Sequence, residues 1–148
     1  MNHSSRSVHF TLWLNRLLMG VVLALVLMMP RLIAWYNTLR ILSDDQNYAI
    51  LAAFYACVPV VLYALWNLEK LLRNIAAGQV FVTENVSFIG RVCFCCAGVG
   101  VICLPSAFFY APLVFMCVIM GFLCPVVNVV RQVFRAAVDL REENDLTI

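Results

Sequence analysis

Four long runs of apolar residues occupy most of the chain, and nearly all charged residues lie between or beyond these runs. A helix needs about 20 mostly apolar residues to cross a bilayer, because the hydrocarbon core is about 30 Å thick and each residue adds about 1.5 Å. Backbone polar groups have no water partner in lipid, which favours helices. The pattern therefore predicts an all-α membrane protein of one domain, residues 1–148, with four antiparallel spans. The spans are expected at about residues 12–33, 48–68, 92–108 and 113–130.

The composition excludes a water-soluble globule. The chain of 148 residues is 64% hydrophobic and 12% charged, whereas soluble domains are about half apolar and about a quarter charged. The formal net charge is only +2, so the protein has no basic field for nucleic acid. We expect a multi-pass protein of the lipid bilayer that does not bind nucleic acid directly.

The distribution of Lys and Arg predicts the orientation. Two of the ten basic residues, Arg31 and Arg40, fall on one side of the predicted membrane, and eight fall on the other. Positive residues accumulate in cytoplasmic segments. Both termini and the connection between the second and third spans are therefore expected in the cytosol, in a bacterial inner membrane. The eight residues are Arg6, Arg16, Lys70, Arg73, Arg91, Arg131, Arg135 and Arg141.

The connection between the second and third spans, residues 69–91, has helical periodicity. Apolar residues recur at i, i+3, i+4, i+7 and i+8 from Leu68, which is the spacing of an amphipathic helix. Glu69 and Arg73 form an i, i+4 pair in the favourable order. We expect a cytosolic amphipathic elbow helix here.

The end of this elbow is also marked in the sequence. Gly78 stands where a helix is expected to end, because glycine adopts the left-handed conformation without steric cost. Thr83 is the expected N-cap of the helix that follows. Two interpretations stay open: an interfacial elbow with Phe81 in the headgroups, or a docking surface for a cytosolic partner.

The C-terminal segment, residues 131–148, is predicted to continue the fourth helix into the cytosol as far as Arg141. Beyond Arg141 the chain is acidic and then ends on aliphatic residues. Such a terminus is expected to fray. Alternatively, Leu146 and Ile148 have the spacing of one face of a strand and could be captured by strand addition.

We expect the elbow and the C-terminal tail to form one cytosolic surface. Acidic tail residues would meet basic elbow residues, and the aliphatic tip would pack near an aromatic residue of the elbow. Exposed ion pairs contribute only about 0–1 kcal/mol each, so apolar contacts would supply most of the docking energy. The residues concerned are Glu142, Glu143 and Asp145 with Lys70 and Arg73, and Leu146 and Ile148 with Phe81.

No catalytic motif and no metal-ligand spacing is recognisable, so no enzyme, cofactor or metal site is expected. No charged residue stands in the middle of a predicted span, where proton and ion pathways usually place one. Seven cysteines fall within the spans, and inert packing is the expected role of such thiols, with thiol redox chemistry as the alternative. They are Cys57, Cys93, Cys95, Cys96, Cys103, Cys117 and Cys124.

Polar residues also collect near the cytosolic ends of the predicted spans. They act either as separate interfacial anchors or as one hydrogen-bonded cluster that ties the helices together. These residues are Asn15, Arg16, Asn67, Glu69, Glu84, Asn85, Arg91, Asn128 and Arg131.

Two segments, residues 72–85 and 137–148, carry a family resemblance. The first contains Gly-x-x-Phe-x-x-x-Asn, and the second ends in Glu-Asn-Asp-Leu-Thr-Ile. With these motifs and its overall layout, the chain resembles the bacterial four-helix membrane family known as domain of unknown function 2975 (DUF2975). The family has no established biochemical activity that the resemblance could carry over. Members of that family are often encoded beside a small helix-turn-helix transcription regulator, which implies a regulatory or sensor component with such a partner.

The main alternative is a small transporter or channel subunit that acts as an oligomer, and a homo-oligomer is left open for either function. The candidate partner-binding residues come from the two family motifs. They are Arg73, Gly78, Phe81, Asn85, Glu142, Glu143, Asp145, Leu146 and Ile148.

Overall fold

The computed structural model of the chain describes residues 3–39 and 43–146, and these form four α-helices. Each helix is long and apolar enough to cross a membrane, which confirms the all-helical prediction with four such helices. Arg40 and Ile148 lie outside the described residues, as do the side chains of Arg6 and Asp145. The helices are α1 (His3–Leu39), α2 (Asp44–Ala76), α3 (Thr83–Ala107) and α4 (Leu113–Leu146).

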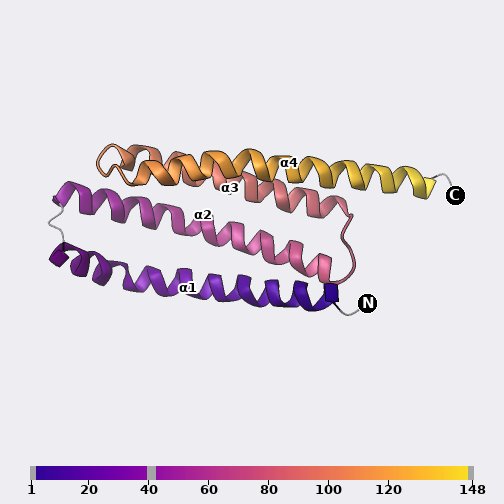
Figure 1. Cartoon of the computed structure of the whole chain (residues 1–148), viewed down its shortest axis with the longest axis horizontal. Helices are drawn as coiled ribbons and strands as arrows, with labels where there is room; N and C mark the ends of the chain where they lie inside the picture. Colours follow the sequence, from indigo (N-terminus) through magenta and orange to yellow (C-terminus); the bar gives the residue numbers. More distant parts are fainter. Residues whose placement is uncertain (1–2, 40–42, 147–148) are drawn as a thin grey trace.

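Each described helix packs only against its neighbours in the sequence. α1 packs on α2, α2 on α3, and α3 on α4, whereas α1 and α4 do not contact each other (Figure 1). Both ends of the described chain and the α2–α3 connection lie at one end of the molecule, called here the termini end (Figure 1). At this end α4 extends well past the other three helices (Figure 1). The bundle is therefore open between α1 and α4.

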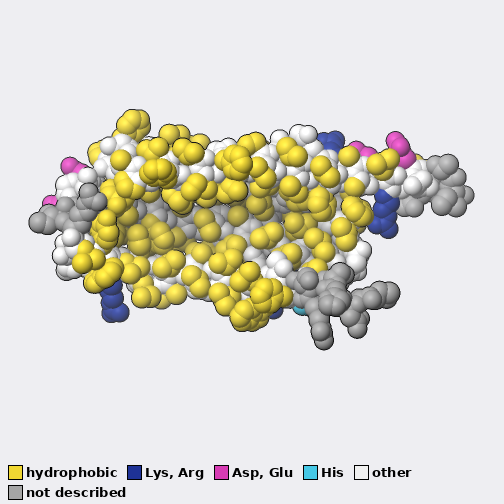
Figure 2. Space-filling view, in the orientation of Figure 1, with side chains coloured by type: hydrophobic (Ala, Val, Ile, Leu, Met, Phe, Trp, Pro, Cys, Tyr) yellow, Lys and Arg dark blue, Asp and Glu magenta, His cyan; other side chains and the backbone are white. Residues whose placement is uncertain are grey.

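Most of the surface along the helices is apolar. Figure 2 shows hydrophobic side chains over the middle of the molecule and charged side chains near its two ends. Large residues such as Leu27 and Phe122 are mostly exposed. Side chains of this kind are stable against lipid rather than water, which accounts for the small number of buried apolar residues.

α3 lies between α2 and α4 and contributes most of the buried core. Small residues on α3 allow this close packing. A Cβ added at Gly98 would lie 3.8 Å from Val60 on α2, and one added at Gly100 would lie 3.5 Å from Met120 on α4. The two glycines thus stand where α3 approaches its neighbours closely.

The helix predicted from Leu68 onward is present, but it is the end of α2 rather than a separate elbow helix. α2 continues without interruption to Ala76, because no helix-breaking residue stands between Leu68 and that point. It ends in a Schellman motif: Gln79 N–H donates to Asn74 O at 2.9 Å, and Gly78 N–H donates to Ile75 O at 3.0 Å.

Gly78 has φ +80°, which confirms it as the residue that ends this helix. Thr83 is not the N-cap of α3. Val82 takes that position in extended conformation without a side-chain capping bond, and Thr83 is the first helical residue.

The C-terminal segment also differs from its prediction. α4 remains helical to Leu146, so the described residues after Arg141 are neither frayed nor extended. The segment from Ala136 to Glu143 contains no glycine or proline and is rich in residues that favour helix, so the helix has no reason to end there. Leu146 is 88% exposed at its tip.

We expect Gly78→Ala to lower the free energy of unfolding by about 1 kcal/mol, because a Cβ is strained in the left-handed conformation. No atom lies within 4 Å of the added Cβ, so the cost comes from the backbone alone. Thermal unfolding of the purified protein in detergent measures the effect. Gly121→Ala is the control, since Gly121 is helical and its added Cβ also meets open space. Equal changes in unfolding temperature for both variants would contradict the left-handed conformation assigned to Gly78.

Candidate functional site

Three asparagines from three helices are buried toward the termini end. Asn15 on α1 is 3% exposed, Asn67 on α2 is 1% exposed and Asn85 on α3 is 0% exposed. A buried amide destabilises a fold unless its donors and acceptor are hydrogen-bonded. The partners of these amides therefore show what holds this end of the bundle together.

Asn85 connects the end of α2 to the start of α3. Its Nδ2 donates to Gln79 O and to Val80 O, both at 2.8 Å. Its Oδ1 accepts from Nδ2 of Asn74 at 2.9 Å. One buried side chain thus fixes the path of the α2–α3 connection. Asn85 contributes by holding this connection, since none of its surface is exposed to a partner.

Asn15 and Asn67 connect further helices. Asn15 Nδ2 donates to Leu65 O on α2 at 3.2 Å, while its buried Oδ1 has no partner among the described residues. Asn67 Nδ2 donates to Tyr63 O at 2.7 Å, and its Oδ1 accepts from Arg91 on α3 at 3.4 Å. These bonds link α1 to α2 and α2 to α3.

Glu69 is the acidic centre of the same region. Its Oε1 accepts from Arg73 at 2.7 Å and from Nε of Arg16 on α1 at 3.1 Å. The hydrogen bond from Arg73, opposed in part by desolvation and aided by Arg16, lowers the pKa of Glu69 below its ordinary value of 4.5. The side chain of Glu69 is 15% exposed, so this carboxylate is well placed to act on both arginines.

α4 joins this end through side-chain packing against α3 and the α2–α3 connection. A Cβ at Gly90 on α3 would lie 2.9 Å from Nε of Arg131, so that glycine leaves room for the arginine side chain. The rings of Phe81 and Phe134 lie 6.3 Å apart. The hydrogen bonds of the three buried asparagines and Glu69, called here the polar cluster, join α1 to α2 and α2 to α3, which is part of what the interpretation as one shared cluster expects. Glu84 and Asn128 are exposed and contribute no hydrogen bond to it among those described.

The predicted contact between tail and elbow is wrong for the residues that the structure describes. Phe81 packs against Phe134 rather than Leu146, and Arg73 pairs with Glu69 rather than with a tail carboxylate. The physical reason is the straight course of α4: twelve residues beyond Phe134, Leu146 lies about 18 Å further along the helix axis. Glu142 instead lines a cleft between the start of α3 and α4.

Thiols form two close pairs that sequence spacing did not indicate. Cys57 and Cys103 have their Sγ atoms 3.8 Å apart, and Cys93 and Cys124 have theirs 3.4 Å apart. The partners stand on different helices, so no local motif could have identified them. Within residues 3–39 and 43–146, no group of three or more His, Cys, Asp or Glu side chains is arranged to hold a metal ion.

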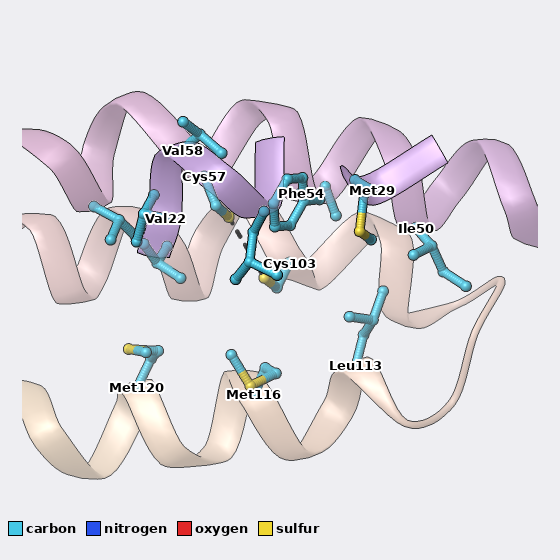
Figure 3. A pocket seen from close by; sticks show the side chains of 14 residues that line it. Val22, Met29, Ile50, Phe54, Cys57, Val58, Cys103, Leu113, Met116 and Met120 are labelled. Carbon is cyan, nitrogen blue, oxygen red and sulfur yellow. Dashed lines mark hydrogen bonds between the residues drawn. The ribbon is translucent and has the colours of Figure 1, made fainter. Parts of the chain in front are cut away.

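All four helices line an apolar cavity of about 320 Å³ in the half of the bundle away from the termini end. Figure 3 shows Val22 and Met29 of α1, Phe54 and Cys57 of α2, and residues of α3 and α4 around it. Its fourteen lining residues are aliphatic, aromatic or sulfur-containing. The cavity exists because α1 and α4 do not pack together.

The four apolar helices and the polar cluster at one end define a multi-pass membrane protein. Residues 10–148 match the model of a family described as protein of unknown function (DUF2975). The chain therefore belongs to this family, and the resemblance noted from the two sequence motifs is confirmed. No curated protein and no solved structure gives a significant match to the chain.

The family motif Gly78, Phe81 and Asn85 now has a physical explanation. The glycine allows the positive φ, the phenylalanine packs on α4, and the asparagine fixes the connection. The sequence indicated the role of Gly78 at the helix end, but not the contacts of Phe81 and Asn85. The sequence indicated the pair of Glu69 with Arg73, but not the contacts of Glu69 with Arg16 or of Asn67 with Arg91, because these partners lie on other helices.

We expect Asn85→Ala to lower the free energy of unfolding by about 3 kcal/mol, because it removes three hydrogen bonds from a buried site. Asn128→Ala, an exposed asparagine on α4, is the matched control and should change stability by less than about 0.5 kcal/mol. Thermal unfolding in detergent distinguishes the two. A small effect at Asn85 would mean that water or relaxation replaces its bonds.

Glu69 should make stability depend on pH. Because its pKa is lowered in the folded state, its stabilising contribution is present above its ordinary value of 4.5 and is lost as the pH falls through the folded value. The stability difference between wild type and Glu69→Gln is therefore expected to be largest at neutral pH and to shrink in acid. Glu142→Gln, at an exposed glutamate of α4, is the control. A difference independent of pH would contradict the ion-pair assignment.

Proposed function

We propose that this protein is a non-enzymatic membrane component that binds a soluble partner through the part of α4 that extends past the other helices. The observation that carries the proposal is an exposed apolar stripe on this helix. Val133 is 63% exposed and Leu140 is 65% exposed, with exposed Val129 and Ala136 on the same face. The spacing i, i+4, i+7, i+11 is that of a helix face that packs on another helix.

The stripe continues beyond the expected end of the fourth span. Of the other described helices only α3 packs on α4, and it leaves this face uncovered. Apolar residues on a helix in water form a surface that favours a partner with a hydrophobic groove or helix. Charged residues flank the stripe, among them Arg135, Asp139 and Arg141, and these would give specificity rather than most of the affinity.

The proposed orientation places the termini end in the cytosol, with four antiparallel spans. The charge distribution supports it: among the residues with described side chains, seven Lys and Arg belong to the termini end, and only Arg31 belongs to the opposite end. The seven are Arg16, Lys70, Arg73, Arg91, Arg131, Arg135 and Arg141.

The family resemblance supplies the kind of partner, a helix-turn-helix transcription regulator that the protein would hold at or release from the membrane. Glu142, Glu143 and Leu146 belong to the extended part of α4 and remain candidate contacts. Arg73 and Phe81 are exposed at the same end, whereas Gly78 and Asn85 would act by shaping the connection.

A transporter or channel subunit that works as an oligomer is the alternative function. The open edges of α1 and α4 favour assembly with further chains. The cavity beside them, however, is lined by apolar residues and offers a permeating ion no opposite charge. The regulatory function is therefore preferred.

Site-specific photo-crosslinking in native membranes tests the proposal. A photoreactive amino acid at Val133 or Leu140 is expected to yield one recurring adduct with a soluble protein. The same amino acid at Val118, an exposed apolar position within the fourth predicted span, should yield lipid adducts only. A docking role for the stripe would be contradicted if Val133 and Leu140 gave no protein adduct. It would also be contradicted if Val118 gave protein adducts equally often.

A further inference from the structure

A second cleft at the termini end lies between the last turns of α2 and the first turns of α3, and it is distinct from the α4 stripe. It has a volume of about 430 Å³. Its wall is formed by Lys70 and Arg73 from α2 and by Glu84, Phe88 and Arg91 from α3. Polar and apolar groups are therefore both presented to an occupant.

The cleft carries an excess of positive charge. Lys70, Arg73 and Arg91 stand against the single carboxylate of Glu84, which leaves two positive charges uncompensated. The neighbouring Glu69 pairs with Arg73 and also with Arg16. Counting both Glu69 and Arg16 adds one negative and one positive charge, so the excess of two positive charges is unchanged. Among residues 3–39 and 43–146, Lys70 and Arg91 form no ion pair. Apart from the bond from Arg91 to Asn67, their hydrogen-bond donors are available to an anion.

The two unpaired cations are held in place by their surroundings. Lys70 Nζ lies 6.0 Å and Arg91 Cζ lies 5.7 Å from the centre of the Phe88 ring, so both charges meet at one aromatic surface. Lys70 Nζ also lies 5.8 Å from the ring of Trp66. Arg91 donates to Oδ1 of the buried Asn67. Cation–π contacts of this kind orient the charge and leave its donors free.

From this geometry we propose that the cleft binds the phosphate group of an anionic phospholipid. A guanidinium presents paired donors that match phosphate oxygens, and an ammonium adds a compact charge beside it. Basic pockets between membrane helices at the cytoplasmic surface recognise anionic headgroups. The Ser87 hydroxyl, also on the wall, supplies a neutral donor.

The flanking residues favour a lipid phosphate over free phosphate in solution. Trp66 is exposed one turn before Lys70 and stands at the predicted end of the second span, where aromatic residues mark the membrane interface. Phe88 adds apolar surface inside the cleft, against which glycerol and the first acyl carbons can pack. Inorganic phosphate would use the cations but gain nothing from this apolar surface.

Lipid retention by the full-length protein tests the proposal. The protein is reconstituted into nanodiscs of phosphatidylcholine with a minor fraction of phosphatidylglycerol, and retained lipid is counted by native mass spectrometry. Lys70→Gln/Arg91→Gln should reduce phosphatidylglycerol retention about thirtyfold, the factor expected when two basic residues leave an anionic lipid surface. Arg135→Gln/Arg141→Gln on α4 removes the same charge outside the cleft and should retain the lipid as wild type does.

Two further measurements distinguish a phospholipid site from misfolding of the double variant and from a site for free phosphate. Ser87 is exposed, so Ser87→Asp is expected to fold normally and leaves Lys70 and Arg91 in place. The added negative charge on the wall of the cleft should still weaken lipid retention. This variant therefore tests the site even if the double variant folds poorly. Millimolar inorganic phosphate should leave the lipid bound. Displacement of the lipid by phosphate, or equal losses in the cleft variant and the α4 control, would overturn a phospholipid site.

Discussion

The arrangement of this protein depends on the need to hydrogen-bond a few buried amides within an otherwise apolar bundle. Asn85 has no exposed surface, and its three hydrogen bonds join the end of α2, the connection and the start of α3. Since α3 packs against both α2 and α4, this residue, by fixing the start of α3, also affects where α4 packs. In lipid, apolar contacts discriminate weakly between alternative packings, so polar bonds and close small-residue contacts carry more of the specificity.

The same end of the molecule combines structural and functional roles. Asn67 holds Arg91 beside the cleft, and Glu69 holds Arg73 at its wall while binding Arg16 on α1. The groups that fix the helices therefore also aim positive charge toward the proposed lipid site. At this end α4 extends past the other helices (Figure 1). The apolar stripe with Val133 and Leu140 lies on this part of α4. A lipid bound at the α2–α3 cleft would thus lie near the connection that contacts α4 through Phe81 and Phe134.

The bundle is not closed on the side between α1 and α4. α1 and α4 do not contact each other, and the cavity between the helices is lined only by apolar and sulfur-containing residues. The thiols of Cys57 and Cys103, 3.8 Å apart, both line this cavity. The described hydrogen bonds between helices that use amide or charged side chains lie toward the termini end, whereas apolar side chains line the cavity elsewhere in the bundle.

The sequence by itself determined the number of helices, their apolar character, the end of α2 at Gly78 and the family, because hydrophobic periodicity, chain-breaking residues and short motifs are local properties. It placed Asn85 in a motif and Glu69 in an ion pair with Arg73. Tertiary structure decided that α2 continues through the expected elbow, that Phe81 meets Phe134 instead of Leu146, and that Arg91 reaches Asn67. These outcomes join residues on different helices, and helix packing, which no local pattern encodes, sets the distances between them.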